Sequence, residues 1–323
     1  MASAEAVAAV IEAGGAHVPE LLDRLEVRLA EVAASHGAVL AEHAGATISA
    51  GGKRLRPLLV FVAAGSASDG VLRAAVAVEL VHSATLVHDD VLDAAALRRG
   101  RPTVVASAGR DIATATGDLL FSRAFSELAA TGSLEAVRTL SHAGSALAEG
   151  ELRQRQDAWN VAVGVERYLA RCELKTARLF EAACMLGALE GADADGRVEA
   201  LGAFGRRVGL AFQLLDDVLD VSGPAERTGK HRGADLLDGT VTLPLILARE
   251  RDPELAALDP RSVRTPAEAE AVCARVEATG ALEEAKRRAL AIVAEAKAEL
   301  PELPGPQREA LELVADGVVE RYA

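Results

Sequence analysis

The sequence predicts an all-α protein, a single-domain helical bundle spanning residues 1–323, and three observations carry this prediction. Ala, Leu, Glu and Arg, which favour helices, dominate the chain. Apolar residues recur at helical spacing, and no stretch alternates for long as a strand does. The interruptions are short and none has low complexity, so no domain boundary is expected. With 50% hydrophobic residues the chain can bury a large core.

The predicted helices follow in chain order from apolar periodicity and from the residues that interrupt it. Glycine or proline marks breaks at 51–52, 100–102, 222–224, 259–260 and 301–306. The periodic segments between and around these breaks are 18–35, 37–49, 57–66, 70–93, 107–130, 133–160, 165–188, 193–221, 242–250, 267–299 and 305–321. One bundle is the simplest way to bury their apolar faces together.

Composition excludes several classes of partner. A net charge of -13 argues against nucleic acid and against attachment to an anionic membrane. Cys172, Cys184 and Cys273 are scattered, so they indicate core residues in a reducing compartment and not a disulfide framework or zinc site. The N-terminus lacks a basic signal segment, and no apolar run is expected to reach the length of a transmembrane span. We therefore expect a cytoplasmic protein.

An acidic helix end lies at residues 86–93, where three aspartates close a predicted helix. Positions four apart share a face, so Asp89 and Asp93 stack and Asp90 turns to the side. Two stacked carboxylates repel unless a cation or protons intervene. Oxygen ligands with no nearby cysteine suit a hard ion such as Mg²⁺, which commonly bridges to substrate phosphates.

An arginine cluster follows this helix end directly. Arg98, Arg99 and Arg101 surround Gly100 and supply planar donors that match phosphate oxygens. A solvated acidic helix end with a basic turn is the alternative. The apolar neighbours of the aspartates favour a magnesium-diphosphate site instead.

The acidic pattern returns at residues 216–220, which repeat Asp-Asp-Val-Leu-Asp from residues 89–93 letter for letter. Two such helix ends facing each other in a bundle would repel unless divalent cations lay between them. The repeat therefore predicts a metal site shared by the two helix ends.

Two other segments carry cations whose roles stay open on pattern alone. Residues 51–57 form a glycine-opened loop before a helix, where Lys53, Arg54 and Arg56 make either an anion site or a plain surface loop. Lys175 lies among apolar neighbours, so it either points inward to a partner or extends to the surface.

The segment 229–244 is rich in glycine and charge and follows the second aspartate motif. We expect it to close over the mouth of the site and to bring Lys230 to phosphate.

Taken in order, the motifs resemble the trans-polyprenyl diphosphate synthase family, most closely its long-chain bacterial members. The motifs are GGKRLRP, HSATLVHDDVLD, RRGRPT, GELRQ, KTA, FQLLDDVLD and GKHRGADLLDGTVTLP. The resemblance implies a bundle of the isoprenoid synthase type around a deep apolar channel, usually as a homodimer. It implies a Mg²⁺-dependent prenyltransferase that joins isopentenyl diphosphate head-to-tail (1'-4, trans) to an allylic diphosphate.

The resemblance also assigns residue roles. About three Mg²⁺ would be held on the allylic diphosphate, by Asp89, Asp93, Asp216 and Asp220. The contacts to that diphosphate would come from Arg98, Lys175 and Lys230. Isopentenyl diphosphate would be bound by Lys53, Arg56, His82 and Arg99. Thr176 and Gln213 would border the developing carbocation, and Asp90 and Asp217 would act indirectly.

One position departs from the family pattern. Thr240 stands where members commonly have lysine. One phosphate contact is therefore missing, or it comes from elsewhere, with Arg232 as a candidate.

Product length follows from the helix face below the first motif. Thr85 and Ala84 lie one turn deeper than Asp89, and Val81 follows on the same face. These small residues leave room for a tail well beyond about fifteen carbons. The resemblance to long-chain members implies products of about C30–C50 from C10–C20 primers, with geranylgeranyl diphosphate as the alternative. Phe121 and Phe125 are candidates for the channel floor or are ordinary core residues.

Two competing functions remain. A class I terpene cyclase would carry a second metal motif rich in Asn, Ser and Glu, which residues 216–220 do not match. An inactive, regulatory subunit of a heteromeric synthase is supported only by Thr240.

Overall fold

A computed structural model describes residues 4–35, 37–49, 52–98, 100–191, 196–223 and 231–320. Its helices are α1 (Ala4–Ala13), α2 (His17–Ala33), α3 (Ala38–Ser49), α4 (Leu55–Ala64), α5 (Asp69–Leu92), α6 (Val104–Ala108), α7 (Arg110–Ala129), α8 (Leu134–Gln156), α9 (Val165–Cys172), α10 (Arg178–Glu190), α11 (Val198–Ser222), α13 (Ala234–Leu237), α14 (Leu243–Arg249), α15 (Pro253–Ala257), α16 (Pro266–Ala278), α17 (Ala281–Ala298) and α18 (Gly305–Glu320). A π-helical turn, η1 (Glu173–Ala177), joins α9 to α10, and a 3₁₀ turn, η2 (Pro260–Ser262), follows α15. The strands β1 (Leu97–Arg98) and β2 (Arg101–Pro102) form an antiparallel hairpin.

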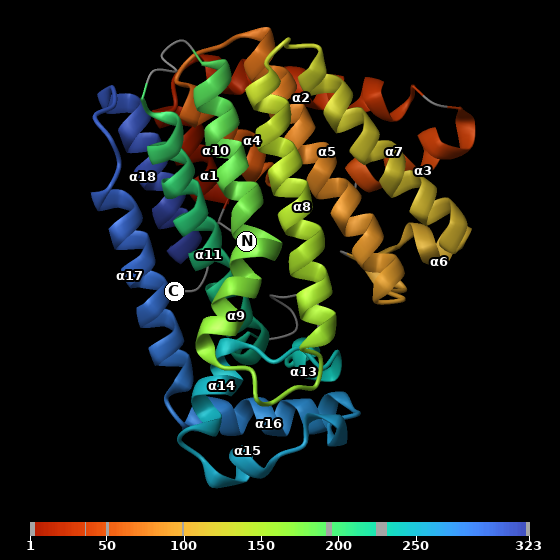
Figure 1. Ribbon diagram of the computed structural model, residues 1–323, viewed down its shortest axis with the longest axis vertical. Coiled ribbons are helices and arrows are strands. Elements are labelled where there is room, and N and C mark those ends of the chain that lie inside the picture. Colours follow the sequence, from red (N-terminus) through yellow and green to blue (C-terminus); the bar gives the residue numbers. More distant parts are fainter. Residues whose placement is uncertain are drawn as a thin grey trace.

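The helices form one bundle, which confirms the all-α prediction. Figure 1 shows α5, α8, α10, α11 and α17 along the long axis of the molecule, with α15 and α16 across its lower end. Helix α5 contacts α2, α4, α7 and α10. Helix α11 packs on α10 and α17. The two helices that carry the aspartate motifs therefore both belong to the interior of the bundle.

Helix α5 begins where the Ser68 side chain accepts a hydrogen bond from the Val71 amide. By length and composition alone α5 could cross a membrane, so the expectation that no apolar run reaches that length was wrong. Its most apolar 18-residue window is 72% buried inside the bundle. The helix is apolar because it is the centre of the core.

The predicted continuous helix over 267–299 was wrong. Gly280 adopts a φ of +72° and separates α16 from α17. Glycine takes this conformation without the penalty that a side chain imposes. A single glycine inside an otherwise periodic segment did not interrupt the apolar pattern.

Helix α1 was not anticipated, and it packs against α18 at the other end of the chain. Helix α8 ends at Gln156, short of the predicted residue 160. Asp157 caps it and is fully buried, with Nε of Arg167 donating at 2.7 Å to its carboxylate. Trp159 then turns the chain with a φ of +64°.

Candidate active site

The first acidic helix end lies at the last turn of α5, as predicted. The amide of Asp93 donates to the carbonyl of Asp89 at 2.8 Å and closes the helix. Burial raises the pKa of Asp89 to about 6, although the nearby ammonium of Lys175 opposes that rise. A carboxylate with this pKa favours a bound cation over exposure of its charge to the apolar core.

Asp90 lies 5% exposed and is bound by Arg98 of the hairpin. Nε and Nη2 of Arg98 lie 2.8 and 2.7 Å from Oδ1 of Asp90. Arg98, predicted to contact a diphosphate, therefore holds a buried carboxylate in this structure. Arg99 lies outside the described residues, and Arg101 is exposed.

The second acidic helix end lies in the last turns of α11. Asp217 is 3% exposed, and the hydroxyl of Tyr168 donates to its Oδ2 at 2.6 Å. Burial, followed by the neighbouring Asp235 carboxylate, raises the pKa of Asp217 to about 8. Asp220 accepts a hydrogen bond from the amide of Asp235 at 3.2 Å, which ties α11 to α13. Asp216 lies partly buried on the same helix.

A π-helical turn presents the two residues predicted to border a carbocation. Thr176 lies in η1, and its hydroxyl donates to Oε1 of Gln213 on α11 at 2.7 Å. Nε2 of Gln213 donates to Asp217 at 2.7 Å. A Cβ at Gly150 of α8 would lie 2.6 Å from the Lys175 amide nitrogen, so only glycine allows α8 this close to the turn. Single-turn π segments inside α-helices frequently occur at functional sites.

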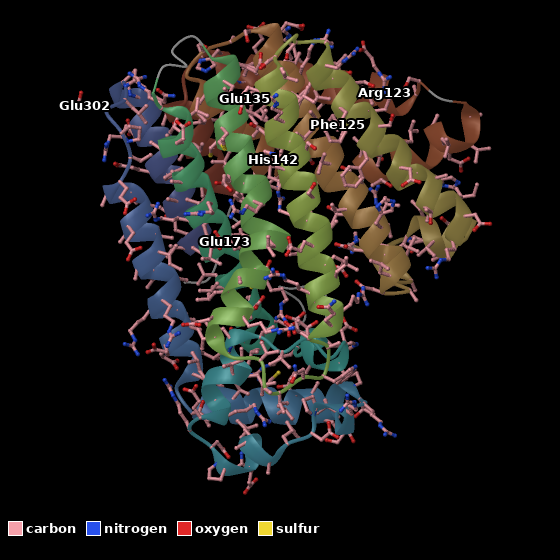
Figure 2. All side chains as sticks on the ribbon, in the orientation of Figure 1. Arg123, Phe125, Glu135, His142, Glu173 and Glu302 are labelled. Atoms are coloured by element: carbon pink, nitrogen blue, oxygen red, sulfur yellow. The ribbon has the colours of Figure 1, made fainter. Side chains whose placement is uncertain are left out.

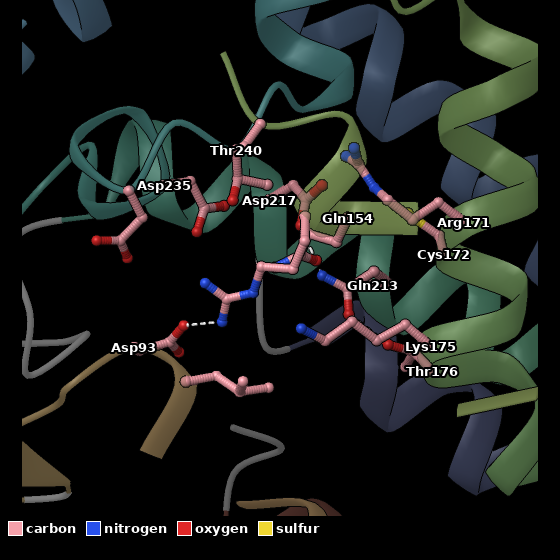
Figure 3. Close-up of a pocket in the computed structure, with 14 residues that line it drawn as sticks. Asp93, Gln154, Arg171, Cys172, Lys175, Thr176, Gln213, Asp217, Asp235 and Thr240 are labelled. Carbon is pink, nitrogen blue, oxygen red and sulfur yellow. Dashed lines mark hydrogen bonds and ion pairs between the residues drawn. The ribbon is translucent and has the colours of Figure 1, made fainter. Parts of the chain in front are cut away.

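A cavity of about 320 Å³ joins these elements, and Figure 3 shows Asp93 on one side and Asp217, Asp235 and Thr240 on the other. Its wall consists of Leu92, Asp93, Gln154, Arg155, Ala158, Arg171, Cys172, Lys175, Thr176, Gln213, Asp217, Asp235, Asp238 and Thr240. The predicted residues Asp93, Lys175, Thr176 and Gln213 thus meet in one space. Asp89, Asp216 and Asp220 flank this wall on the same two helices.

Two cations and two carboxylates form a network beside the cavity. Nζ of Lys175 lies 2.5 Å from Oε2 of Glu151, so Lys175 points inward to a partner and does not extend to the surface. Nη2 of Arg155 lies 2.5 Å from Oδ1 of Asp93. Burial alone would raise the pKa of Glu151, but Lys175 and Arg155 hold it below its usual value.

Among the charged residues of the cavity wall, Arg155, Asp235 and Asp238 were not selected by sequence reasoning. Arg155 follows the Gly-Glu-Leu-Arg-Gln segment, and Asp235 and Asp238 lie in the segment predicted to cover the site. Their charge was visible in the sequence. Their partners were not, because these are set by contacts between elements far apart in the chain.

The segment before α4 is only partly a candidate anion site. Arg54 has a φ of +47° and binds the carboxylates of Glu26 and Glu79 at 2.6 and 2.7 Å. In this structure the Arg54 guanidinium therefore neutralises the buried Glu79 and is not directed to an anion. Lys53 and Arg56 remain partly exposed, and the Arg56 guanidinium lies 4.7 Å from the ring centre of Phe180.

The residues predicted to set product length lie below Asp89 on α5. Ala84 and Val81 are 0% and 1% exposed. The hydroxyl of Thr85 donates to the carbonyl of His82 at 2.8 Å. Phe121 of α7 stacks on His88, with ring centres 5.9 Å apart, so it lies beside the residue that precedes Asp89.

The segment 229–244, predicted to close over the site, contributes Thr240 to the cavity wall, whereas Lys230 lies outside the described residues. Arg232 binds Glu270 and Glu277 of α16 at 2.8 and 2.6 Å, and also the carbonyl of Val221. In this structure the Arg232 guanidinium is held by α16, so its suggested role as the replacement phosphate contact stays a prediction.

A second cavity, of about 420 Å³, lies between α8 and α10 and is lined by none of the predicted site residues. Figure 2 labels Glu135 and His142, which line it, on the outer face of α8. Although this cavity is larger than the first, no residue of either aspartate motif lines it, so we do not take it as the active site.

The donor set of the first cavity fits a hard divalent ion. Asp93, Asp217, Asp235 and Asp238 on its wall all offer oxygen. Among the described residues, no group of three acidic, histidine or cysteine side chains could hold a metal by itself. Ligands divided between two helices suit an ion that completes its coordination with substrate oxygens.

Carboxylates, two guanidinium groups and an ammonium around one cavity in an all-α bundle suit an enzyme that binds a metal ion together with a phosphorylated substrate. The polyprenyl synthetase family model matches residues 38–278. The chain therefore belongs to the polyprenyl synthetase family and is a trans-prenyltransferase of the polyprenyl diphosphate synthase type.

Relatives and solved structures agree with this assignment. Heptaprenyl diphosphate synthase component 2 of Geobacillus stearothermophilus is 40% identical over 81% of this chain and 83% of its own length. Nonaprenyl diphosphate synthase of Mycobacterium tuberculosis is 35% identical over 98% and 94%. A polyprenyl synthase of Caulobacter crescentus, complexed with calcium and isoprenyl diphosphate, superposes with a TM-score of 0.90 at 35% identity over 97% and 98%. The family uses a divalent metal.

Proposed function

We propose that the two aspartate helix ends hold Mg²⁺ on an allylic diphosphate, through Asp89 and Asp93 on α5 and Asp216 and Asp220 on α11. The meeting of Asp93 and Asp217 on one cavity wall is the observation that supports this proposal. The burial that raises the pKa of Asp89 also favours a cation there. About three ions would balance the carboxylates and the diphosphate, and they would withdraw charge from the leaving group.

The remaining roles are proposed from the family pattern, and the place of Lys175, Thr176 and Gln213 on the cavity wall supports theirs. Lys175, Arg98 and Lys230 contact the allylic diphosphate. Thr176 and Gln213 direct oxygen atoms towards the allylic carbon, where positive charge develops as the C–O bond breaks. A closed apolar site keeps water away from that carbon.

Isopentenyl diphosphate is bound on the side of α4 by Lys53, Arg56 and His82, together with Arg99. The double bond of isopentenyl diphosphate attacks the allylic carbon. The departing diphosphate then removes a proton from the resulting cation, and a new double bond forms.

We propose a long-chain product of about C30–C50 made from C10–C20 primers, because Ala84 and Val81 offer no bulky side chain below Asp89. Relatives named heptaprenyl, octaprenyl and nonaprenyl diphosphate synthase support this range. A geranylgeranyl diphosphate synthase of Methanosarcina mazei is 38% identical, which keeps the C20 product as the second candidate. Phe121 is the candidate that limits the product.

We also propose a single domain over residues 1–323, a cytoplasmic location and a homodimer. The relative named as component 2 of a heptaprenyl synthase makes a heteromeric assembly the alternative. Size measurement of the purified chain, alone and with candidate subunits, separates the two assemblies.

The deciding experiment incubates the chain and Mg²⁺ with isopentenyl diphosphate and C10, C15 or C20 allylic diphosphates, and identifies products by mass. The expected result is elongation beyond C20 that depends on isopentenyl diphosphate. Hydrocarbon formed from the allylic diphosphate alone would indicate a cyclase. Absence of any product would favour a subunit that needs a catalytic partner.

A further inference from the structure

Arg155 connects the two helices that carry the network beside the cavity. Its side chain is 41% exposed, lies on the cavity wall and contacts two carboxylates. Nη2 lies 2.5 Å from Oδ1 of Asp93 on α5, and Nε donates to Oε1 of Glu151 on α8 at 2.8 Å. The dashed line in Figure 3 marks the contact to Asp93. A guanidinium therefore neutralises a carboxylate that the proposed function assigns to a metal ion.

A divalent ion bound to Asp93 would weaken the ion pair between Asp93 and Arg155. Like charges a few ångströms apart repel, so the ion and the guanidinium compete for one carboxylate. Glu151, the second partner of Arg155, is already bound by Lys175 at 2.5 Å. With Asp93 taken by the ion, only the contact of Nε with Oε1 of Glu151 would remain, and Nη2 of Arg155 would be free to turn into the cavity.

An incoming diphosphate is the acceptor that the released guanidinium fits. Its planar donors match phosphate oxygens in a two-point contact. Arg171 is a second arginine on the wall of this cavity. It is 3% exposed and donates to the carbonyl of Val241 at 2.7 Å. Arg171 is therefore held in place, whereas Arg155 can move.

We propose that Arg155 exchanges partners during substrate binding: it neutralises Asp93 before a divalent ion binds, and it contacts the diphosphate once the ion has taken Asp93. This inference rests on the proposed function of the site. It makes Arg155 a substrate-binding residue that also raises the metal concentration needed to fill the site.

The exchange predicts effects of opposite sign in one variant. In Arg155→Met, Mg²⁺ added alone should bind about 3- to 5-fold more tightly, because its competitor at Asp93 is gone. Inorganic pyrophosphate added at saturating Mg²⁺ should bind about 10-fold more weakly, because a charge-assisted contact is lost. Isothermal titration calorimetry measures both affinities without turnover.

Arg153→Met is the matched control. Arg153 lies two residues earlier on α8, is 43% exposed and pairs with Glu149 at 2.6 Å four residues before it, as Arg155 pairs with Glu151. It does not line the cavity, so neither affinity should change. Arg155→Gln is measured in parallel, so that a folding defect of the methionine variant does not decide the result.

Each other outcome overturns a definite part of the proposal. Tighter binding of both Mg²⁺ and pyrophosphate would show that Arg155 only opposes the metal and never contacts the diphosphate. Weaker binding of both in the methionine and glutamine variants would show a structural role. Failure of the unmodified chain to bind pyrophosphate with Mg²⁺ would overturn the proposed function together with the exchange.

Discussion

The two Asp-Asp-Val-Leu-Asp segments are identical in sequence and differ in what surrounds them. The middle carboxylate of the first, Asp90, is bound by the guanidinium of Arg98. The middle carboxylate of the second, Asp217, accepts hydrogen bonds from two neutral donors, Tyr168 and Gln213. A guanidinium therefore holds the middle carboxylate of the first segment, whereas two neutral groups hold that of the second.

The same contrast holds for the last aspartate of each segment. Asp93 pairs with Arg155, but Asp220 accepts from the backbone amide of Asp235. Identical letters on two helices thus give two electrostatic environments. The two helix ends should therefore respond differently to mutation and pH.

The largest effect is expected when the first aspartate of each segment is replaced. Asp89→Ala and Asp216→Ala should each lower kcat by at least roughly 10²–10³-fold, the scale of losing one preorganised electrostatic contact. Steady-state turnover with isopentenyl and allylic diphosphates measures this loss, and Asp23→Ala on the exposed face of α2 is the control. Full activity in either variant would remove that helix end from the metal site.

The next comparison introduces phenylalanine at the same distance in sequence before each aspartate segment. Ala84 and Ala211 both lie five residues before the first aspartate, and both are 0% exposed. Ala84→Phe should shorten the product, because its side chain lies one turn below Asp89. Ala211→Phe should cost about 1–3 kcal/mol of stability through overpacking and leave product length unchanged.

Mass analysis of the products and denaturant titration of both variants separate these effects. An unchanged chain length in Ala84→Phe would contradict the assignment of this face to the channel.

Sequence reasoning reached the helical architecture and the two aspartate ends because both depend on short-range periodicity. It did not reach Arg155, whose importance comes from Asp93, a residue 62 positions earlier in the chain. It left the role of Arg54 open because the buried Glu79 that binds this arginine lies 25 residues away. Charge in a sequence indicates that a partner exists, but only the packed bundle selects which one.

The middle carboxylates give a smaller, more selective test. Asp90→Asn should lower the free energy of unfolding by about 1–2 kcal/mol, because Arg98 loses its ionised partner. Asp217→Asn should change stability at pH 7 by less than this, because a carboxyl with a pKa of about 8 already carries a proton there. Urea unfolding at pH 7 in the presence of a chelator measures both. A larger loss in Asp217→Asn would show that the neutral donors hold a charged group.

The last comparison concerns the slope of the free energy of unfolding against pH in metal-free protein. The folded chain binds the Asp217 proton more tightly than the unfolded chain, whose carboxyl has the ordinary pKa of 3.8. The contribution of this group to the free energy of unfolding is therefore complete below about pH 4 and is lost as pH rises to about 8. Asp217→Asn should flatten that decline, whereas Asp90→Asn should not. Because metal binding requires the deprotonated form of its ligands and a cation near α11 favours ionisation, Mg²⁺ with pyrophosphate should flatten the decline in the unmodified chain as well. A slope that responds neither to Asp217→Asn nor to Mg²⁺ with pyrophosphate would mean that the two helix ends share one electrostatic environment after all.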